Sequence, residues 1–403
     1  MPTRAQVCTW IAAVGLLAPA VAAAQGRTER EIVDTIVRDG PQARAIRAEA
    51  EVARRQQLAR LTYPNPSISY SREGAGFTEF FQAEQSLPLF GARRALSRAG
   101  VAASAAAEAE RDLRLWLLRS DAAAAVARMV AEQARLELAQ GLVREVERLI
   151  EILRIREREG EGSRFDRLRA EQELRDASQL VASATVALAE TRAAVSGMLP
   201  QAAPLTTVVA SSVTPPPTVP LETLLTRATA TRAELRALRQ LEQRATFEAE
   251  AARRSRLPSP TLFGGMKRAD DASRRETGGV FGVSVALPLF DAGGREAARW
   301  EAERAHVVAE RESIEYRVRS EIAGASEVLA VRQAALSHEQ QGAADELVQI
   351  AEVAYREGEV GILELLDAVR TAARAGIRGI DLRLDARLAQ IALERAVGDT
   401  LWP

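Results

Sequence analysis

The chain of 403 residues contains a single cysteine, Cys8. That cysteine lies in an N-terminal segment that we expect to be removed. A mature chain without cysteine forms no disulfides, no thiolate metal sites and no cysteine nucleophile. Acidic and basic residues nearly cancel, leaving a formal net charge of −1, so no field of the whole molecule indicates a nucleic-acid partner.

The N-terminus has the pattern of a secretory signal peptide. The basic start "MPTR" precedes the apolar stretch "VCTWIAAVGLLAPAVA" and the small residues Ala22–Ala24. The apolar part is too short for a spanning helix, so we predict a cleaved signal peptide over 1–24, with a buried N-terminal helix as the alternative. Since no later stretch approaches about 18 unbroken apolar residues, any membrane-crossing part must be built of β-strands.

Proline is absent from two long tracts, 89–199 and 289–402. Because proline is excluded from helix interiors, both tracts are free to be helical. One unbroken helix from Ala92 to about Arg156 would span on the order of 100 Å, too long for a compact bundle. Two adjacent heptad seams with many alanines favour helices flanked on both sides. One heptad column is Ile322, Leu329, Leu336, Ala343 and Ile350.

The sequence repeats itself. Leu-Pro-Leu-Phe occurs at 87–90 and again at 287–290, and "REGEGSRFDRL" (158–168) matches "REGEVGILELL" (356–366). Four such blocks recur in the same order at offsets of roughly 194 to 202 residues, which indicates two tandem repeats. The predicted domains are a first repeat over 25–199, a Pro-rich linker over 200–220 and a second repeat over 221–403.

Each repeat contains a segment with period-two alternation, which is typical of a half-exposed β-hairpin. The predicted hairpins cover 67–87 and 261–287, with apolar side chains such as Phe81 and Phe281 on one face. Four strands cannot close a barrel, and open edges cannot lie in lipid. Either the hairpins are soluble or several chains pool their strands.

The double "LPLF" and the segment "YREGEVGILELLDAVR" (355–370) resemble the TolC family of outer-membrane efflux channels. "LPLFGARR" is most similar to its heavy-metal, CzcC-like branch. The resemblance covers essentially the whole mature chain. It implies a mainly α fold with transmembrane β: a trimeric 12-stranded β-barrel, four strands per chain, continuing into a long periplasmic α-helical barrel. Pro88 and Pro288 would mark the exits from strand to helix, where a missing N–H costs the ladder nothing.

The resemblance also implies a function, partners and a location. The chain would be a homotrimeric exit duct in the outer membrane of a Gram-negative bacterium, extending into the periplasm. It would passively conduct small toxic solutes, metal cations or drugs, from an inner-membrane pump of the RND type through a periplasmic adaptor. Two alternatives stay open: a type I protein-secretion channel, and a periplasmic coiled-coil scaffold or adaptor without a pore.

The helix-to-helix tips, at 157–163 and 356–361, are candidate adaptor contacts in this family. Glycines permit the chain to reverse there, and an ordinary interhelical turn explains the residues equally well. The tip residues are Gly160, Glu161, Gly162 and Ser163 in the first repeat, and Gly358, Glu359, Val360 and Gly361 in the second.

Glu364 and Asp367 lie three residues apart and so share a helix face. They match acidic positions that line the periplasmic entrance in the family, where rings of carboxylates attract cations. Asp166 and Tyr355 match family positions of a hydrogen-bonded latch around that entrance. The arginine that some members use in this latch aligns with Val360, so the latch is either built differently or absent.

No pattern of catalytic residues occurs, and we predict neither an enzyme nor a cofactor. His306 and His338 are 32 residues apart without a local ligand pattern, so surface positions are favoured over a metal site. The paired glycines fit no phosphate-binding signature. Energy for transport would therefore come from the inner-membrane pump.

Overall fold

The computed structural model describes residues 27–59, 61–74, 78–201, 205, 208–209, 219–271, 274–339 and 342–402. The predicted signal peptide over 1–24 lies outside the described residues, as does most of the predicted linker over 200–220.

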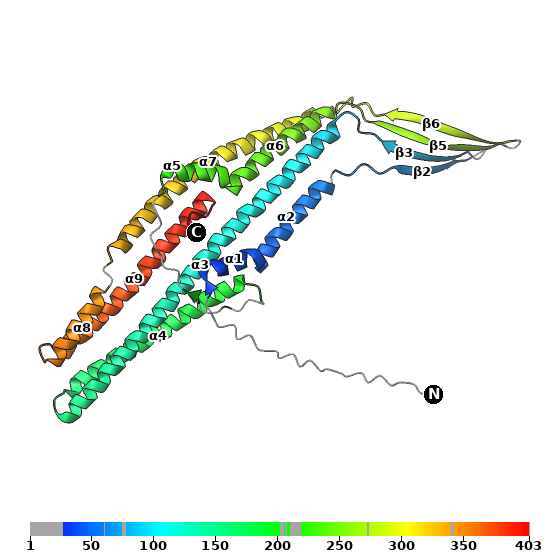
Figure 1. The fold of residues 1–403 in the computed structure, drawn as a ribbon. Coiled ribbons are helices and arrows are strands. Elements are labelled where there is room, and N and C mark those ends of the chain that lie inside the picture. Colours follow the sequence, from blue (N-terminus) through cyan, green and yellow to red (C-terminus); the bar gives the residue numbers. More distant parts are fainter. Residues whose placement is uncertain are drawn as a thin grey trace, which may run out of the picture.

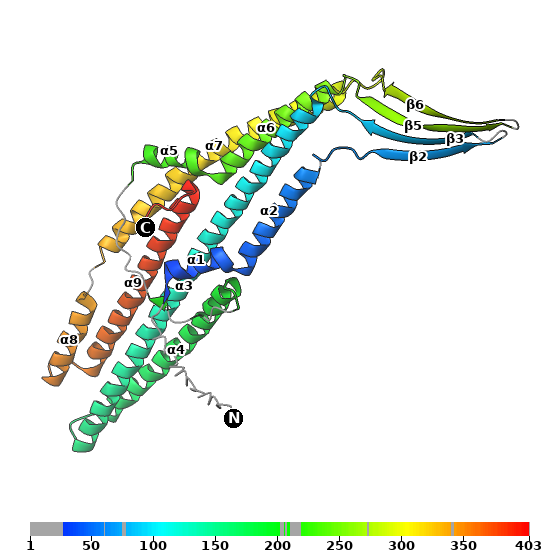
Figure 2. The same cartoon turned by 45° about the vertical axis from the view of Figure 1, so that its right-hand side comes forward.

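Long helices form a rod with a small sheet at one end (Figure 1). Helix α3 (Ala92–Glu159) has 68 residues, about 100 Å at 1.5 Å per residue, and it runs from the sheet to the far tip (Figure 2). The long unbroken helix predicted from the absence of proline is therefore confirmed. No helix in the described part of the chain is long and apolar enough to cross a membrane.

Five of the other eight helices of the described chain pack directly on α3, and the remaining three pack on those five. The first half adds α1 (Glu29–Asp39), α2 (Pro41–Ala59) and α4 (Arg164–Met198), and the second half adds α5 (Leu221–Thr231), α6 (Ala233–Arg254), α7 (Gly294–Ser337), α8 (Ala343–Arg356) and α9 (Ile362–Val397). Strands β1 (Arg27–Thr28) and β4 (Val208–Val209) form a short parallel pair. The antiparallel turns between α3 and α4 and between α8 and α9 lie together at the end opposite the sheet (Figures 1 and 2).

The second half departs from the heptad pattern at one place. The column from Ile322 to Ile350 predicts one helix, yet α7 ends at Ser337 and α8 begins at Ala343. Gly342 has φ +97°, which a continuing helix does not permit. Glu339 lies against α9, where its Oε1 would be 2.3 Å from a Cβ placed on Gly379. The backbone conformation of Gly342 and the contact of Glu339 with α9 thus accompany a helix break that the seven-residue apolar spacing does not indicate.

The sheet has the order β2-β3-β5-β6, and every neighbouring pair is antiparallel. Its strands are β2 (Ser67–Glu73), β3 (Thr78–Ser86), β5 (Pro260–Asp271) and β6 (Arg274–Val285). The two hairpins are joined through β3 and β5, so each repeat supplies one hairpin to a single sheet. Because proline cannot donate to a ladder, Pro88 and Pro288 follow the last residues of β3 and β6.

Three separate hydrophobic clusters hold the rod together. The first joins α5, α6, α7 and α9 around Leu235 and Ile322. The second joins α1 to α4 around Val126 and Met129. The third lies near the tips and joins α3, α4 and α9 around Leu366. Many buried positions of α3 are alanines, which lets the neighbouring helices approach closely.

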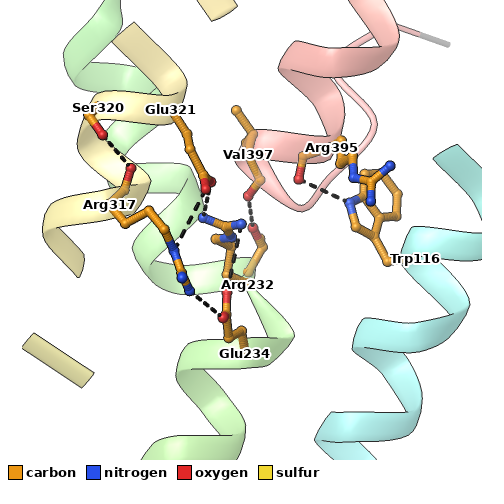
Figure 3. A network of polar contacts seen from close by, with 9 residues as sticks. Trp116, Arg232, Glu234, Arg317, Ser320, Glu321, Arg395 and Val397 are labelled. Carbon is orange, nitrogen blue, oxygen red and sulfur yellow. Dashed lines mark hydrogen bonds and ion pairs between the residues drawn. The ribbon is translucent and has the colours of Figure 1, made fainter. Parts of the chain in front are cut away.

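A polar network joins both halves where α5 meets α6 (Figure 3). The side chain of Arg232, only 12% exposed, pairs with Glu321 of α7 at 3.2 Å and with Glu234 at 3.8 Å. Nearby, the indole N–H of Trp116 on α3 donates to the carbonyl of Arg395 on α9 at 3.4 Å. The Oγ1 of Thr231 also donates to the carbonyl of Val397 at 3.4 Å, so the C-terminal end of α9 is held by residues from both halves of the chain.

The first cluster allows a stability test. Leu235 is fully buried, so Leu235→Ala should remove about 2–5 kcal/mol through lost transfer energy and a residual cavity. Hydrogen exchange of the α6 amides measures this local loss. Val331→Ala, at an exposed position on α7, is the matched control and should change the exchange by no more than about 0.5 kcal/mol. Equal effects of the two variants would contradict the assigned core.

Candidate functional site

The two faces of the sheet differ sharply in polarity. Directly paired residues lie on the same face, so Ile68 shares a face with Phe281, and Tyr70 with Phe81 and Met266. These side chains are exposed, Phe281 to 85%. The opposite face carries mainly small and polar residues, including Ser67, Ser69, Gln82, Gly265, Gly278 and Ser284. An exposed apolar face of this kind requires an apolar partner.

Two aromatic side chains, Phe80 and Phe263, lie on the small and polar face, and a glycine accommodates the second. Phe263 pairs directly with Gly282. A Cβ at Gly282 would come within 2.2 Å of the Phe263 ring. The ring therefore covers the backbone of the neighbouring strand instead of projecting away from the sheet.

Both outer strands of the sheet have an open side. In the order β2-β3-β5-β6, β2 and β6 each pair with one neighbour among the described strands. An open edge presents unpaired N–H and C=O groups and is a template for another strand. The sheet is thus unfinished as a single chain, and a further strand can join it on either side.

The first tip is a tight turn between α3 and α4. Gly160 adopts φ +80°, and the N–H of Glu161 donates to the carbonyl of Arg156 at 2.9 Å. Ser163 caps α4, because its Oγ accepts the N–H of Phe165 at 3.1 Å. Gly162 has no room for a side chain, since a Cβ there would lie 2.9 Å from the Glu157 nitrogen.

The second tip repeats this construction between α8 and α9. Gly358 adopts φ +79°, and the N–H groups of Glu359 and Val360 both donate to the carbonyl of Ala354, at 2.9 and 3.4 Å. Gly361 is the N-cap of α9. The four predicted residues of each tip therefore form the reversal itself.

Glu364 and Asp367 lie on the exposed side of α9, at its start. Both side chains are exposed, and neither has an ion pair within the described part of the chain. The opposite side of the same turns carries Ile362, Leu365 and Leu366, which belong to the third cluster. Glu364 also lies in the first turn, where the helix dipole favours a negative charge.

Asp166 and Tyr355 are not joined to each other within one chain. The Tyr355 ring packs on the third cluster, with the guanidinium carbon of Arg156 5.3 Å from its centroid. Asp166 lies in the first turn of α4, where its N–H donates to the Ser163 carbonyl at 3.1 Å. A latch between these residues stays a prediction about contacts between chains.

Sequence reasoning missed the ion pairs that connect the helices near the tips. Nε of Arg370 on α9 donates to the buried carboxylate of Glu173 on α4 at 2.8 Å, and this contact raises the pKa of Arg370. Arg148 on α3 donates to Glu145 and to Glu352 on α8, each at 2.6 Å. Only the Glu145–Arg148 spacing is visible in the sequence, because the other partners lie about 200 residues away.

The Arg148 contact makes the docking of α8 sensitive to pH. Partial burial, and a hydrogen bond to Glu145, raise the pKa of Glu352 above its ordinary value, against the opposing attraction of Arg148. A raised pKa means that the docked state holds the proton more tightly than the undocked one. Docking of α8 on α3 is therefore strongest in acid and weakens as the pH rises through the raised pKa.

Glu352→Gln tests this linkage. In the wild type, hydrogen exchange of the α8 amides, corrected for intrinsic rates, should speed up as the pH rises from about 4.5, the ordinary value of the carboxyl. The variant keeps a neutral side chain at every pH, so its exchange should no longer depend on pH. Glu357→Gln, at an exposed position in the adjoining turn, should behave like the wild type. An undiminished pH dependence in Glu352→Gln would exclude this carboxyl as the cause.

The fold is that of known outer-membrane channels. The structure of CusC has a TM-score of 0.74 with 20% identity and covers 92% of each chain. VceC from Vibrio cholerae gives a TM-score of 0.70 with 19% identity, over 93% of this chain and 97% of that one. The open state of MtrE from Neisseria gonorrhoeae gives a TM-score of 0.74 with 21% identity, over 93% and 89%.

Sequence comparison finds a family similarity in the second half of the chain. A search of curated protein sequences finds no match. The sequence profile described as outer membrane efflux protein matches residues 224–399, which span α5 to α9 and both strands of the second hairpin. The second half of the chain is thus similar to the outer membrane efflux protein family, and the fold of the whole chain is that of the channel structures.

Proposed function

We propose that this chain is the outer-membrane exit duct of a tripartite efflux system, reaching from the outer membrane into the periplasm. One observation carries the proposal: a four-stranded sheet with an exposed apolar face and two open edges stands at the end of a helical rod. The apolar face suits lipid, and lipid does not tolerate open edges. The strands of several chains must therefore close a common barrel.

Three copies satisfy this requirement. Four strands per chain give twelve in a homotrimer, an even number within the range of outer-membrane barrels. The apolar face then contacts lipid and the small and polar face lines the lumen, as the alternation in such barrels demands. The helices continue the same tube into the periplasm and the solute moves through it passively.

The tips are the proposed contact with a periplasmic adaptor. Apolar side chains flank both turns and are exposed, among them Ile155 and Phe165 beside the first tip and Leu363 beside the second. An exposed apolar patch with a polar rim is typical of a protein interface. The similarity of "LPLFGARR" to the heavy-metal branch supports an RND-type inner-membrane pump and metal cations or drugs as cargo.

The oligomeric mass of the mature protein tests the proposal. Extracted from isolated outer membranes with detergent, the protein should run as a trimer and form pores in planar bilayers. Salt washes alone should not release it, because the apolar sheet face lies in lipid. Release by salt as a monomer or dimer would contradict the duct and favour a periplasmic scaffold.

Glu364 and Asp367 are the proposed acidic ring at the periplasmic entrance. Three copies would place six carboxylates there, and acidic rings concentrate cations. Glu364→Gln with Asp367→Asn should weaken the block of the pore by multivalent cations by roughly tenfold in half-blocking concentration. Bilayer recordings measure this block. Glu357→Gln, in the turn before α9, is a control expected to leave the block unchanged, and an unchanged block in the double variant would remove both residues from the entrance.

A further inference from the structure

The junction between sheet and helices carries an apolar surface that the duct function does not use. It comprises the segments 87–95, 254–260 and 286–295, where β3, β5 and β6 meet α3, α6 and α7. Its large apolar side chains are exposed, and Phe290 is fully so. They are Leu89, Phe90, Leu257, Leu287, Leu289 and Phe290. The three segments adjoin the ends of β3 and β6 and the start of β5.

A pocket opens in the same junction. It has a volume of about 310 Å³ and is lined from both halves of the chain, by Pro88 and Phe90 from the first and by Leu287 and Pro288 from the second. Arg254 and Ser255 line it as well. This volume lies at the small end of the range for ligand pockets, and the lining is mostly apolar with a few polar groups. An acyl chain with a polar head has this character.

Positive charge surrounds the pocket at one level of the rod. Arg94 lies in the first turn of α3, Arg256 directly after α6 and Arg295 in the first turn of α7. All three are exposed. The three elements meet at the sheet end of the rod in both views (Figures 1 and 2). Within the described residues, none of these three arginines has a hydrogen bond, an ion pair or a ring contact.

The acidic side chains near the junction already have partners within the chain. Glu250 pairs with Arg254, Glu296 with Arg299 and Glu301 with Arg253, while Asp291 accepts the N–H of Gly293 at 2.9 Å. The first turn of α3 contains no acid at all, although a helix start favours negative charge. Two of the unpaired cations, Arg94 and Arg295, thus lie at helix starts, which themselves attract anions.

We propose that this junction binds the phosphate headgroups of anionic phospholipids in the periplasmic leaflet of the outer membrane. Arg94, Arg256 and Arg295 contact the phosphates, and the exposed leucines and phenylalanines contact the acyl chains. Long basic side chains near a membrane interface direct their charge toward the headgroups while their stems cover apolar surface. The surface would fix the depth of the duct in the bilayer. This inference rests on the proposed function, because the apolar face must lie in lipid.

The test uses the full mature chain, purified in detergent and titrated with dioleoyl phosphatidylglycerol. Native mass spectrometry counts the lipids that stay bound to the trimer. The triple variant Arg94→Gln, Arg256→Gln and Arg295→Gln should bind this lipid roughly tenfold more weakly than the wild type. The matched control replaces Arg128, Arg192 and Arg319, exposed arginines of the helical rod without partners among the described residues, and should bind as the wild type does.

Three results would overturn the proposal. Unchanged lipid binding by the triple variant would exclude the arginines. Complete displacement of the lipid by excess inorganic phosphate would show a site for free anions and not for a lipid. Loss of the trimer in the triple variant would show that the arginines are contacts between subunits.

Two further measurements keep the test decisive. The variant Arg94→Lys, Arg256→Lys and Arg295→Lys retains the charge and should restore most of the binding. If circular dichroism shows that the glutamine variant does not fold, lipid binding by the wild type is measured at low and high salt instead. Binding through exposed charges must fall at high ionic strength, and binding that does not fall would overturn the proposal. Pore formation by the wild type is recorded separately. A wild type that forms no pores would refute the proposed duct. A wild type that forms pores, together with a triple glutamine variant that binds lipid as the wild type does, would refute this inference alone.

Discussion

Unsatisfied backbone hydrogen bonds at the two edges of the sheet are the constraint on which the rest of the structure depends. An edge strand in water is merely at risk of aggregation, but an edge strand in lipid is excluded outright. The order β2-β3-β5-β6 leaves one such edge on either side. If the sheet lies in lipid as proposed, it requires the assembly of several chains before any contact between helices is considered.

The helical rod follows from the same requirement. A barrel shared by several chains places each sheet on its perimeter, so the helices that leave the sheet begin side by side around a ring. Alanines along α3 allow its neighbours to pack closely. Helix α4 packs on α3 through the second and third clusters, and α6 packs along α3 as well. In the proposed barrel, each chain would thus supply a section of wall and not a closed bundle.

Much of this architecture is predictable from the sequence because it depends on local rules. Proline-free tracts predict α3, period-two alternation predicts the strands, and the positions of Pro88 and Pro288 predict where the strands end. The break between α7 and α8 was not predictable, since the heptad spacing runs straight through it. The ion pairs of Arg148 with Glu352 and of Arg370 with Glu173 were not predictable either, because they depend on which helices lie side by side. The roles of Glu364 and Asp367 stay predictions, since one chain does not contain a ring.

The three hydrophobic clusters have a consequence for cooperativity. Most domains of ordinary shape have one core and melt in a single transition, whereas here the core is divided into three clusters, of which only the third lies near the tips. The second and third clusters share α3 and α4, and the first and third share α9. The tip can loosen while the middle of the rod stays folded, so in the proposed duct one chain would combine a rigid anchor in the membrane with a softer periplasmic end.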